Sequence, residues 1–156
     1  MYKILGLLLI LGVFQCDKPE VNAENVLVGE WRYVGTYSHT VDYECYVCNN
    51  FEYNKSIYRI NFEDANNYSA NINLLTAKGV YNVGLDKNDG SIVSGTFENI
   101  DMQILNKPFE TPADTKVKNM LLESTGFYVV FNARKKGYDE LTLSSNNNEY
   151  LLFVRK

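Results

Sequence analysis

The chain has little histidine and proline and no long apolar run. Its 156 residues include 1 His and 3 Pro. A Ser/His/Asp arrangement would have to use His39, and no Gly-x-Ser-x-Gly elbow accompanies it. The apolar run from Ile4 to Phe14 is shorter than the about 20 residues that span a bilayer core. The sequence therefore gives little support to catalysis and predicts no membrane-spanning helix.

An excess of positive charge is also absent. The formal net charge is -4, which leaves no basic patch for phosphates, so nucleic acid is not expected as a partner. No Gly-rich phosphate loop joins a strand to a helix. The segment Asp86 to Gly90 lacks the Glu that a calcium loop needs and is predicted to be a hairpin turn. We expect no cofactor.

The N-terminal residues indicate export. Lys3 precedes the apolar run and Cys16 follows it, as in a secretory signal peptide. A Cys at this point resembles a bacterial lipoprotein signal, which implies a signal peptide over 1–15 and a lipid on Cys16. The protein would then be anchored to a membrane of the bacterial cell envelope, with the outer membrane as the expected site. An ordinary signal peptide with an incidental Cys is the alternative.

The remainder is predicted to be one tethered domain. Residues 16–25 are polar and are expected to form a flexible tether, and residues 26–156 have the length of a single domain. The chain holds 12 Tyr and 8 Phe, which favours a β-rich domain. Its Asn runs, such as Asn146-Asn147-Asn148, are typical of turns.

Alternation of apolar and polar residues predicts about eight short strands. Trp31, Tyr33 and Tyr37 share one face of the first strand, and Tyr68, Ala70, Ile72 and Leu74 share one face of another. Ala77 to Gly79 is predicted to close a hairpin, and Ile100 to Leu105 to extend or follow a strand. The expected fold is mainly β (α+β), an antiparallel sheet curled into a barrel or half-barrel.

One short helix is predicted near 112–124. Thr111 suits its N-cap and Pro112 its first turn, while Asp114 complements the positive end of the helix dipole. Val117, Met120, Leu121 and Ser124 share one face, and Gly126 is expected to end the helix. The helix is expected to plug or flank one opening of the barrel.

The order of features resembles the META domain family, to which the heat-shock lipoprotein HslJ belongs. The features are Gly29-Glu30-Trp31, the strand Gly79-Val80-Tyr81, the short helix, and the last hairpin from Leu141-Thr142-Leu143 to Tyr150-Leu151-Leu152-Phe153. The resemblance covers roughly Val28 to Arg155. It implies a non-enzymatic, stress-related envelope protein that binds or supports other envelope proteins.

A second resemblance is to small bacterial lipocalin-like domains, which also open with Gly-x-Trp. It implies a carrier whose barrel interior holds a small apolar ligand. The residues that could line such an interior are Trp31, Tyr33, Tyr58 and Tyr81. Trp31 is most simply explained as a core plug.

Cys45 and Cys48 form an even pair if Cys16 carries lipid. In an oxidising compartment a small-loop disulfide is the simplest prediction. A redox-active pair, two free thiols, or a metal site with His39 and Asp42 or Glu44 are the alternatives. One Cys-x2-Cys without a second pair is weak evidence for a metal, so no metal site is predicted.

Overall fold

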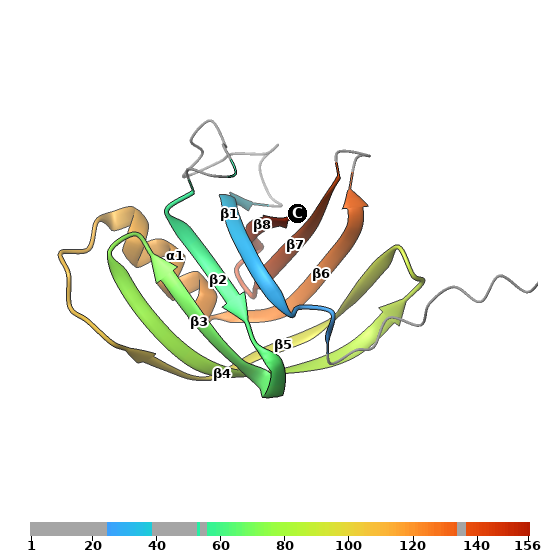
Figure 1. Cartoon of the computed structure of the whole chain (residues 1–156), viewed down its shortest axis with the longest axis horizontal. Coiled ribbons are helices and arrows are strands. Elements are labelled where there is room, and N and C mark those ends of the chain that lie inside the picture. The colour runs from blue at the N-terminus through green and yellow to red at the C-terminus, as the bar shows by residue number, and fades with distance from the viewer. Residues whose placement is uncertain (1–24, 39–52, 54–55, 134–136) are drawn as a thin grey trace, which may run out of the picture.

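The structure is a computed structural model that describes residues 25–38, 53, 56–133 and 137–156. These residues form a closed antiparallel barrel in which each strand pairs with the next and β1 pairs with β8 (Figure 1). The predicted eight-strand barrel is confirmed, in its fully closed form. The strands are β1 (Gly29–Ser38), β2 (Tyr58–Phe62), β3 (Asn67–Ile72), β4 (Leu75–Asn88), β5 (Ile92–Ile104), β6 (Ser124–Ala133), β7 (Tyr138–Ser145) and β8 (Glu149–Arg155).

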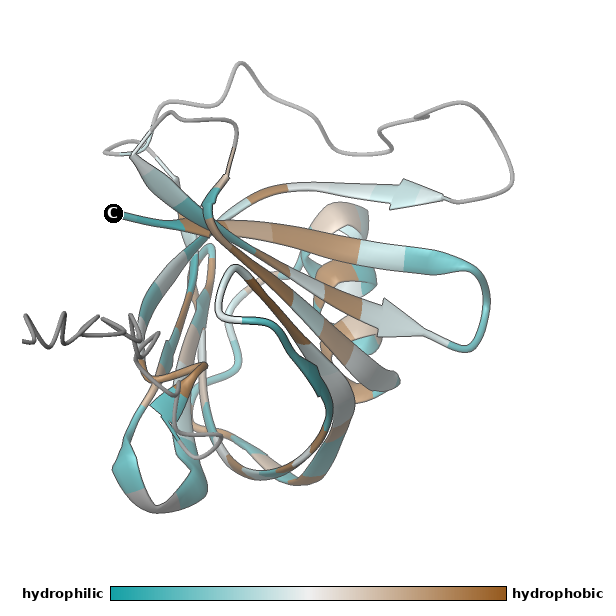
Figure 2. Cartoon of the chain, turned by 90° about the vertical axis from the view of Figure 1, so that its right-hand side faces the viewer, coloured by the Kyte–Doolittle hydropathy of each residue, from teal (hydrophilic) through white to brown (hydrophobic). Residues whose placement is uncertain are grey.

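Because neighbouring strands are antiparallel, the barrel has two distinct ends. The helix end holds the end of β1, the turn between β3 and β4, the connection through α1 (Pro112–Leu122), and the turn between β7 and β8. The terminal end holds the start of β1, the end of β8, the 3-10 turn η3 (Asp64–Asn66) and the β4–β5 turn. In Figure 2 the C-terminus lies on the left, and the helix is seen behind the strands near the middle of the view.

The strand residues that face inward form one continuous core. Along β2, the buried side chains are Tyr58, Ile60 and Phe62, as the alternation predicts. The core also takes in Val26 and Leu27, which precede β1. Its largest fully buried side chains are those of Trp31, Tyr68, Tyr81, Phe62, Phe97, Leu27, Ile60 and Leu75.

In β1 the predicted alternation fails after Tyr33. A register shift lies between Tyr33 and Gly35, so Thr36 and Ser38 become the buried positions. A bulge of this kind moves every later side chain to the opposite face. Tyr37 is therefore not in the core, and its ring stacks on Tyr150 with 5.5 Å between centroids.

The hairpin between β3 and β4 was misplaced in the prediction. Its turn is Asn73-Leu74, because Ile72 pairs with Leu75 and Asn73 adopts a φ of 57°. Asn accepts this left-handed conformation more readily than most residues. Leu74 is consequently exposed rather than part of the inner face, and Ala77 to Gly79 lie within β4.

Gly79 marks a close contact instead of a turn. A Cβ at this position would collide with the Tyr68 ring and with the carbonyl oxygen of Asp101. The missing side chain thus makes room for a buried tyrosine from the neighbouring strand.

The β4–β5 hairpin closes at Asp89, whose side chain accepts hydrogen bonds from the Ser91 and Ile92 N–H groups. The Ile92 N–H, with further hydrogen bonds from Ser91, lowers the pKa of Asp89 to about 2. The residues Ile100 to Ile104 continue β5, which confirms the predicted extension of that strand.

The helix α1 begins as predicted. Thr111 and Asp114 form a reciprocal capping box, and Pro112 lies in the first turn. The helix stops at Leu122, however, and Ser124 and Gly126 belong to β6, so Gly126 does not end it. Glu123 donates its N–H to the Asn119 carbonyl, and the Ser124 hydroxyl donates to the Met120 carbonyl. None of the helices in the described residues is long and apolar enough to span a membrane.

Candidate functional site

Two of the aromatic residues predicted to line a ligand space lie together near the helix end. The rings of Tyr33 and Tyr58 meet edge to face, 5.2 Å apart. Both are buried, and the Tyr33 hydroxyl lies 2.7 Å from the Thr36 hydroxyl. Burial raises the pKa of Tyr33 to about 12, so this phenol stays neutral at physiological pH.

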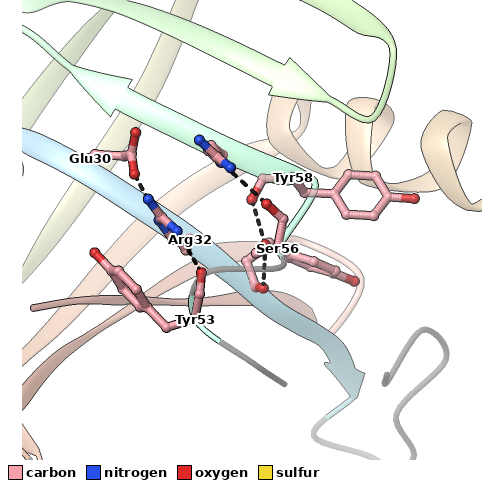
Figure 3. Close-up of polar contacts among 7 residues, drawn as sticks. Glu30, Arg32, Tyr53, Ser56 and Tyr58 are labelled. Carbon is pink, nitrogen blue, oxygen red and sulfur yellow. Dashed lines mark hydrogen bonds and ion pairs between the residues drawn. The ribbon is translucent and has the colours of Figure 1, made fainter. Parts of the chain in front are cut away.

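Tyr58 reaches from β2 toward α1 (Figure 3). Its hydroxyl donates a 2.8 Å hydrogen bond to Asp114 Oδ1. Burial, reinforced by the neighbouring Asp114 carboxylate, raises the pKa of Tyr58. The Ser56 hydroxyl bonds to the carbonyl oxygens of Tyr33 and Tyr58 and fixes the entry into β2 (Figure 3).

Trp31, the third predicted residue, closes the terminal end. Its side chain is 0% exposed, and its Nε1 donates a 2.6 Å hydrogen bond to the Leu27 carbonyl. The guanidinium of Arg155 lies 4.2 Å above the ring. The same Arg155 donates to the Val28 carbonyl and pairs with Asp139, so it joins the segment before β1 and the strand β7 to the plug.

Tyr81, the fourth predicted residue, packs in a separate aromatic cluster. Its ring lies 4.9 Å from that of Phe62 and 5.8 Å from that of Phe97, and Tyr68 adjoins it. Burial raises the pKa of Tyr81 and that of Tyr68, the latter to about 12. Tyr81 is only 1% exposed. Other side chains therefore fill the space around it.

Asp114 is the buried ionisable group at the helix end. Its Oδ2 accepts from the Thr111 N–H at 2.8 Å and from the Asn73 amide at 3.4 Å, while Oδ1 accepts from Tyr58. Burial by itself would raise the pKa of Asp114, but these hydrogen bonds together outweigh it and lower the pKa. The carboxylate thus joins α1 to β2 and to the β3–β4 turn.

The outer wall beside β1 carries a second polar group of contacts. Arg32 pairs with Glu30 at 2.8 Å and donates to the Tyr53 carbonyl at 2.6 Å (Figure 3). The guanidinium also lies 4.3 Å above the Tyr53 ring. The Arg32 charge is therefore already balanced within the protein.

The described residues line two open clefts outside the barrel, each of about 720 Å³. One lies where β5 separates from β6, and Glu98, Asn99, Glu123 and Asn146 help to line it. The other follows the outer face of α1, from Phe109 past Lys116 to Glu149. Lys116 and Glu149 form a 2.8 Å ion pair across the second cleft.

Several predicted site residues lie outside the described residues. These are Cys16, with its predicted lipid, and the loop residues His39, Asp42, Glu44, Cys45 and Cys48, with the predicted disulfide and its alternatives. Within the described part of the chain, no group of three His, Cys, Asp or Glu side chains is placed to hold a metal ion.

The sequence indicates Asp114 only as a complement to the helix dipole and identifies no role for Arg155. The roles of Arg155 and Asp114 depend on contacts with residues far away in the chain, Val28 and Tyr58. Only the local role of Asp114 had a signal, the Thr-x-x-Asp spacing of a capping box.

Comparisons with known proteins identify the fold. No family model matches the chain, and no curated protein does either. Two solved structures share its fold. One is a DUF4847 family protein from Bacteroides vulgatus, 14% identical with a TM-score of 0.56, where the match covers 86% of this chain and 98% of that one.

The other is a protein from Burkholderia xenovorans whose structure was determined by NMR. It is 13% identical with a TM-score of 0.57, and the match covers 86% of each chain. Sequence identities this low show similarity of fold alone. The closed eight-strand barrel is compatible with the lipocalin-like resemblance, and no family model supports the META resemblance.

Proposed function

We propose that this chain is a lipid-anchored, non-catalytic protein of the bacterial cell envelope that binds its partner with the outside of a filled barrel. The observation that carries this proposal is the packing of the interior. A carrier would turn its interior aromatic side chains toward the ligand. In this protein all four of the predicted lining residues are buried in the core cluster, namely Trp31, Tyr33, Tyr58 and Tyr81. A ligand inside the barrel would have to displace them.

The closures at both ends support the same proposal. At the helix end, Val117, Met120 and Leu121 of α1 are buried in the core. At the terminal end, Val26 and Leu27 are buried in the same core cluster as Trp31, which bonds to the Leu27 carbonyl. A helix that fills the opening is also what the META resemblance implies, and it favours surface binding over a lipocalin-like carrier of a small apolar ligand.

Lack of catalysis is the second part of the proposal. The buried tyrosines have raised pKa values and remain neutral, so they are poor general bases. Asp114 stays ionised and is enclosed by its hydrogen-bond donors. The tyrosines thus pack in the core, and Asp114 caps the helix.

The lipid on Cys16 is tested by feeding cells a palmitate analogue that carries an alkyne. The label should enter the wild-type protein and the control Cys45→Ala, and should be lost from Cys16→Ala. In cell fractionation, the wild-type protein should be found in the membrane fraction, and Cys16→Ala should be lost from that fraction. Equal labelling of Cys16→Ala and Cys45→Ala would contradict the anchor.

A further inference from the structure

The strand β5 is longer than its partner strand on one side. Its residues Ile92 to Thr96 pair with Gly126 to Val130 of β6, and there this ladder stops. On the other side, the pairing with β4 continues to Ile104. In the described part of the chain, the segment Glu98 to Ile104 therefore has a strand partner on one side only. We name this segment the β5 edge.

One hydrogen bond shows which way the main-chain groups of the β5 edge point. The Leu105 N–H donates to the Thr76 carbonyl at 2.9 Å. These two residues are opposite each other, because the ladder pairs Ile104 with Ala77. In an antiparallel ladder, such hydrogen-bonded pairs alternate with pairs whose main-chain groups point outward. The N–H and C=O groups of Met102 and Ile104 therefore point away from β4.

These outward main-chain groups are open to a partner. Among the described residues, no hydrogen bond outside the β4–β5 ladder reaches the main chain of Met102 or Ile104. The segment is also accessible, since Ile100 is 53% and Ile104 is 41% exposed, and Asp101 and Gln103 are exposed as well. Unpaired main-chain groups on an exposed strand are the groups to which a further strand binds. The β5 edge thus has the chemistry of a strand-addition site.

One of the two clefts begins where the β5 edge begins. It lies between β5, the end of α1 and the start of β6, and Asn146 and Asn147 of the β7–β8 turn also line it. The carboxylates of Glu98 and Glu123 line this cleft, and none of the described residues that line it is basic. A polypeptide extended along the β5 edge would reach the cleft with its next residues. The cleft would then favour a positively charged side chain.

The charge of the β5 edge itself favours a basic partner. The segment holds two carboxylates, those of Glu98 and Asp101, and no Lys or Arg. In the β4–β5 ladder Glu98 is paired with Asn82, so no basic residue faces it there. Opposite charges across a strand pair stabilise the pair, and like charges destabilise it. A Lys or Arg in the added strand would therefore bind better than an Asp or Glu.

The same charges disfavour a second copy of this chain as the added strand. Two β5 edges in contact would bring the Glu98 and Asp101 carboxylates of both copies together, with no basic residue of either edge between them. Charged side chains on an open edge are one way in which proteins prevent edge-to-edge association. The expected occupant is therefore a different polypeptide that carries positive charge.

A second open edge differs from the β5 edge in charge and shape. It belongs to β4 beyond Val80, where the pairing with β3 ends. This β4 edge carries Lys87 as well as Asp86, and no β4 residue lines either cleft. It therefore provides an internal control for effects that are specific to the β5 edge.

We propose that the β5 edge binds an extended basic segment of another polypeptide as an added strand, with a Lys or Arg of that segment in the cleft between Glu98 and Glu123. This inference deepens the proposed function and rests on its claim that partners bind outside the barrel. It does not depend on the lipid. In strand addition, main-chain hydrogen bonds give affinity and side chains give specificity.

The probe for the test is a library of random decapeptides displayed on phage, selected on the full-length protein in detergent. Selected peptides should contain Lys or Arg more often than the unselected library. Ile104→Pro removes one outward N–H, which a strand edge tolerates, and should weaken binding of a selected peptide about ten-fold. Ile104→Ala keeps this N–H and should bind within about two-fold of the wild type.

The charge of the cleft is tested with the same peptide. Glu98→Gln with Glu123→Gln keeps the shape of both side chains and should weaken binding about five-fold, with a smaller dependence on salt. Asp86→Asn on the β4 edge is the matched control and should leave binding unchanged. If the cleft variant and the control lose the same affinity, the cleft does not select the basic residue and the proposal is overturned.

Amide hydrogen exchange, measured by NMR, locates the added strand. In the free protein, the N–H groups of Met102 and Ile104 should exchange faster than those of Gln103 and Leu105, which face β4. The selected peptide should slow the exchange of Met102 and Ile104. Equal protection of all four groups before the peptide is added would contradict the open edge. Fast exchange of Met102 and Ile104 in the complex would contradict strand addition.

The remaining outcomes separate the edge from other modes of binding. A library that yields no binding peptide overturns the proposal, and so does a dimer in sedimentation that Ile104→Pro abolishes, which would favour a second copy. If selected peptides bind Ile104→Pro as tightly as the wild type, the β5 edge is excluded while binding elsewhere on the outer surface still stands. Melting curves show whether each variant is folded, and if Ile104→Pro is not, exchange in the wild type decides.

Discussion

At the terminal end the barrel is closed by an aromatic plug, whereas at the helix end it is closed by a helix attached through a buried carboxylate. Trp31 is held by the Leu27 carbonyl and covered by Arg155, which also pairs with Asp139. At the other end, Asp114 joins α1 to Tyr58 and Asn73. Both closures fill the interior, but the exposed apolar side chains of Leu74, Leu105 and Phe109 lie at the helix end. The interior side chains thus stabilise the fold at both ends of the barrel, and the two ends differ on their outer surfaces.

The largest effect is expected at the terminal end. Trp31→Ala removes the plug, its hydrogen bond to Leu27 and its contact with Arg155, and should lower the free energy of unfolding by about 3–5 kcal/mol. Urea denaturation followed by tyrosine fluorescence measures this change. A loss below about 1 kcal/mol would show that the terminal end is not closed by Trp31.

Truncation of the helix at the other end should have a slightly smaller effect. Met120→Ala and Leu121→Ala each remove a buried side chain and should each lower the free energy of unfolding by about 2–5 kcal/mol. Leu122→Ala is the control on the same helix, because Leu122 is an exposed residue. Unchanged denaturation midpoints for both buried positions would mean that α1 does not fill the opening.

The carboxylate of the helix end gives a third, smaller effect that depends on pH. Asp114→Asn weakens the capping box and the bond from Tyr58, so the free energy of unfolding should fall by about 1–2 kcal/mol at neutral pH. The pKa of Asp114 is lower in the folded protein than its ordinary value. Its stabilisation is therefore complete above about pH 4 and is lost as the pH falls through the lowered pKa.

Unfolding curves measured at several pH values check this sign. The difference between the wild type and Asp114→Asn should shrink in acid and stay constant from about pH 5 upward. A difference that grew in acid would mean that the Asp114 carboxylate is destabilised by folding.

The smallest effect is expected for the exposed apolar side chains at the helix end. The double variant Leu74→Ser with Phe109→Ser changes exposed side chains and should alter the free energy of unfolding by no more than about 0.5 kcal/mol. The same denaturation assay measures it. A large loss of stability would mean that these side chains pack against the domain, and the contrast between the two ends would disappear.

Local patterns predicted most of the fold. Alternation located the strands and the inward residues of β2, and the Thr-Pro start located α1, because these signals lie within a few neighbouring residues. The errors arose where tertiary packing overrides a local signal. Gly79 resembles a turn residue, but it lies in a strand and leaves space for the Tyr68 ring. The bulge after Tyr33 places Tyr37 on the outer face of the barrel.

The site was harder to predict for the same reason. The four aromatic residues named from the sequence are all buried, but only Tyr33 and Tyr58 adjoin each other at the helix end. The contact of Trp31 with Arg155 joins opposite ends of the domain sequence, so no spacing indicates it. The exposure of Leu74 could not be predicted, because this residue continues the alternation of an inward-facing strand until the turn interrupts it.

The most direct test of the account is the intact mass of the membrane-extracted protein, measured under native and under denaturing conditions. We predict one mass, equal to the chain from Cys16 to Lys156 plus its acyl groups, and the same mass after denaturation. An unacylated chain would contradict the anchor. A small apolar molecule present in the native mass and released on denaturation would contradict the filled barrel and favour a carrier.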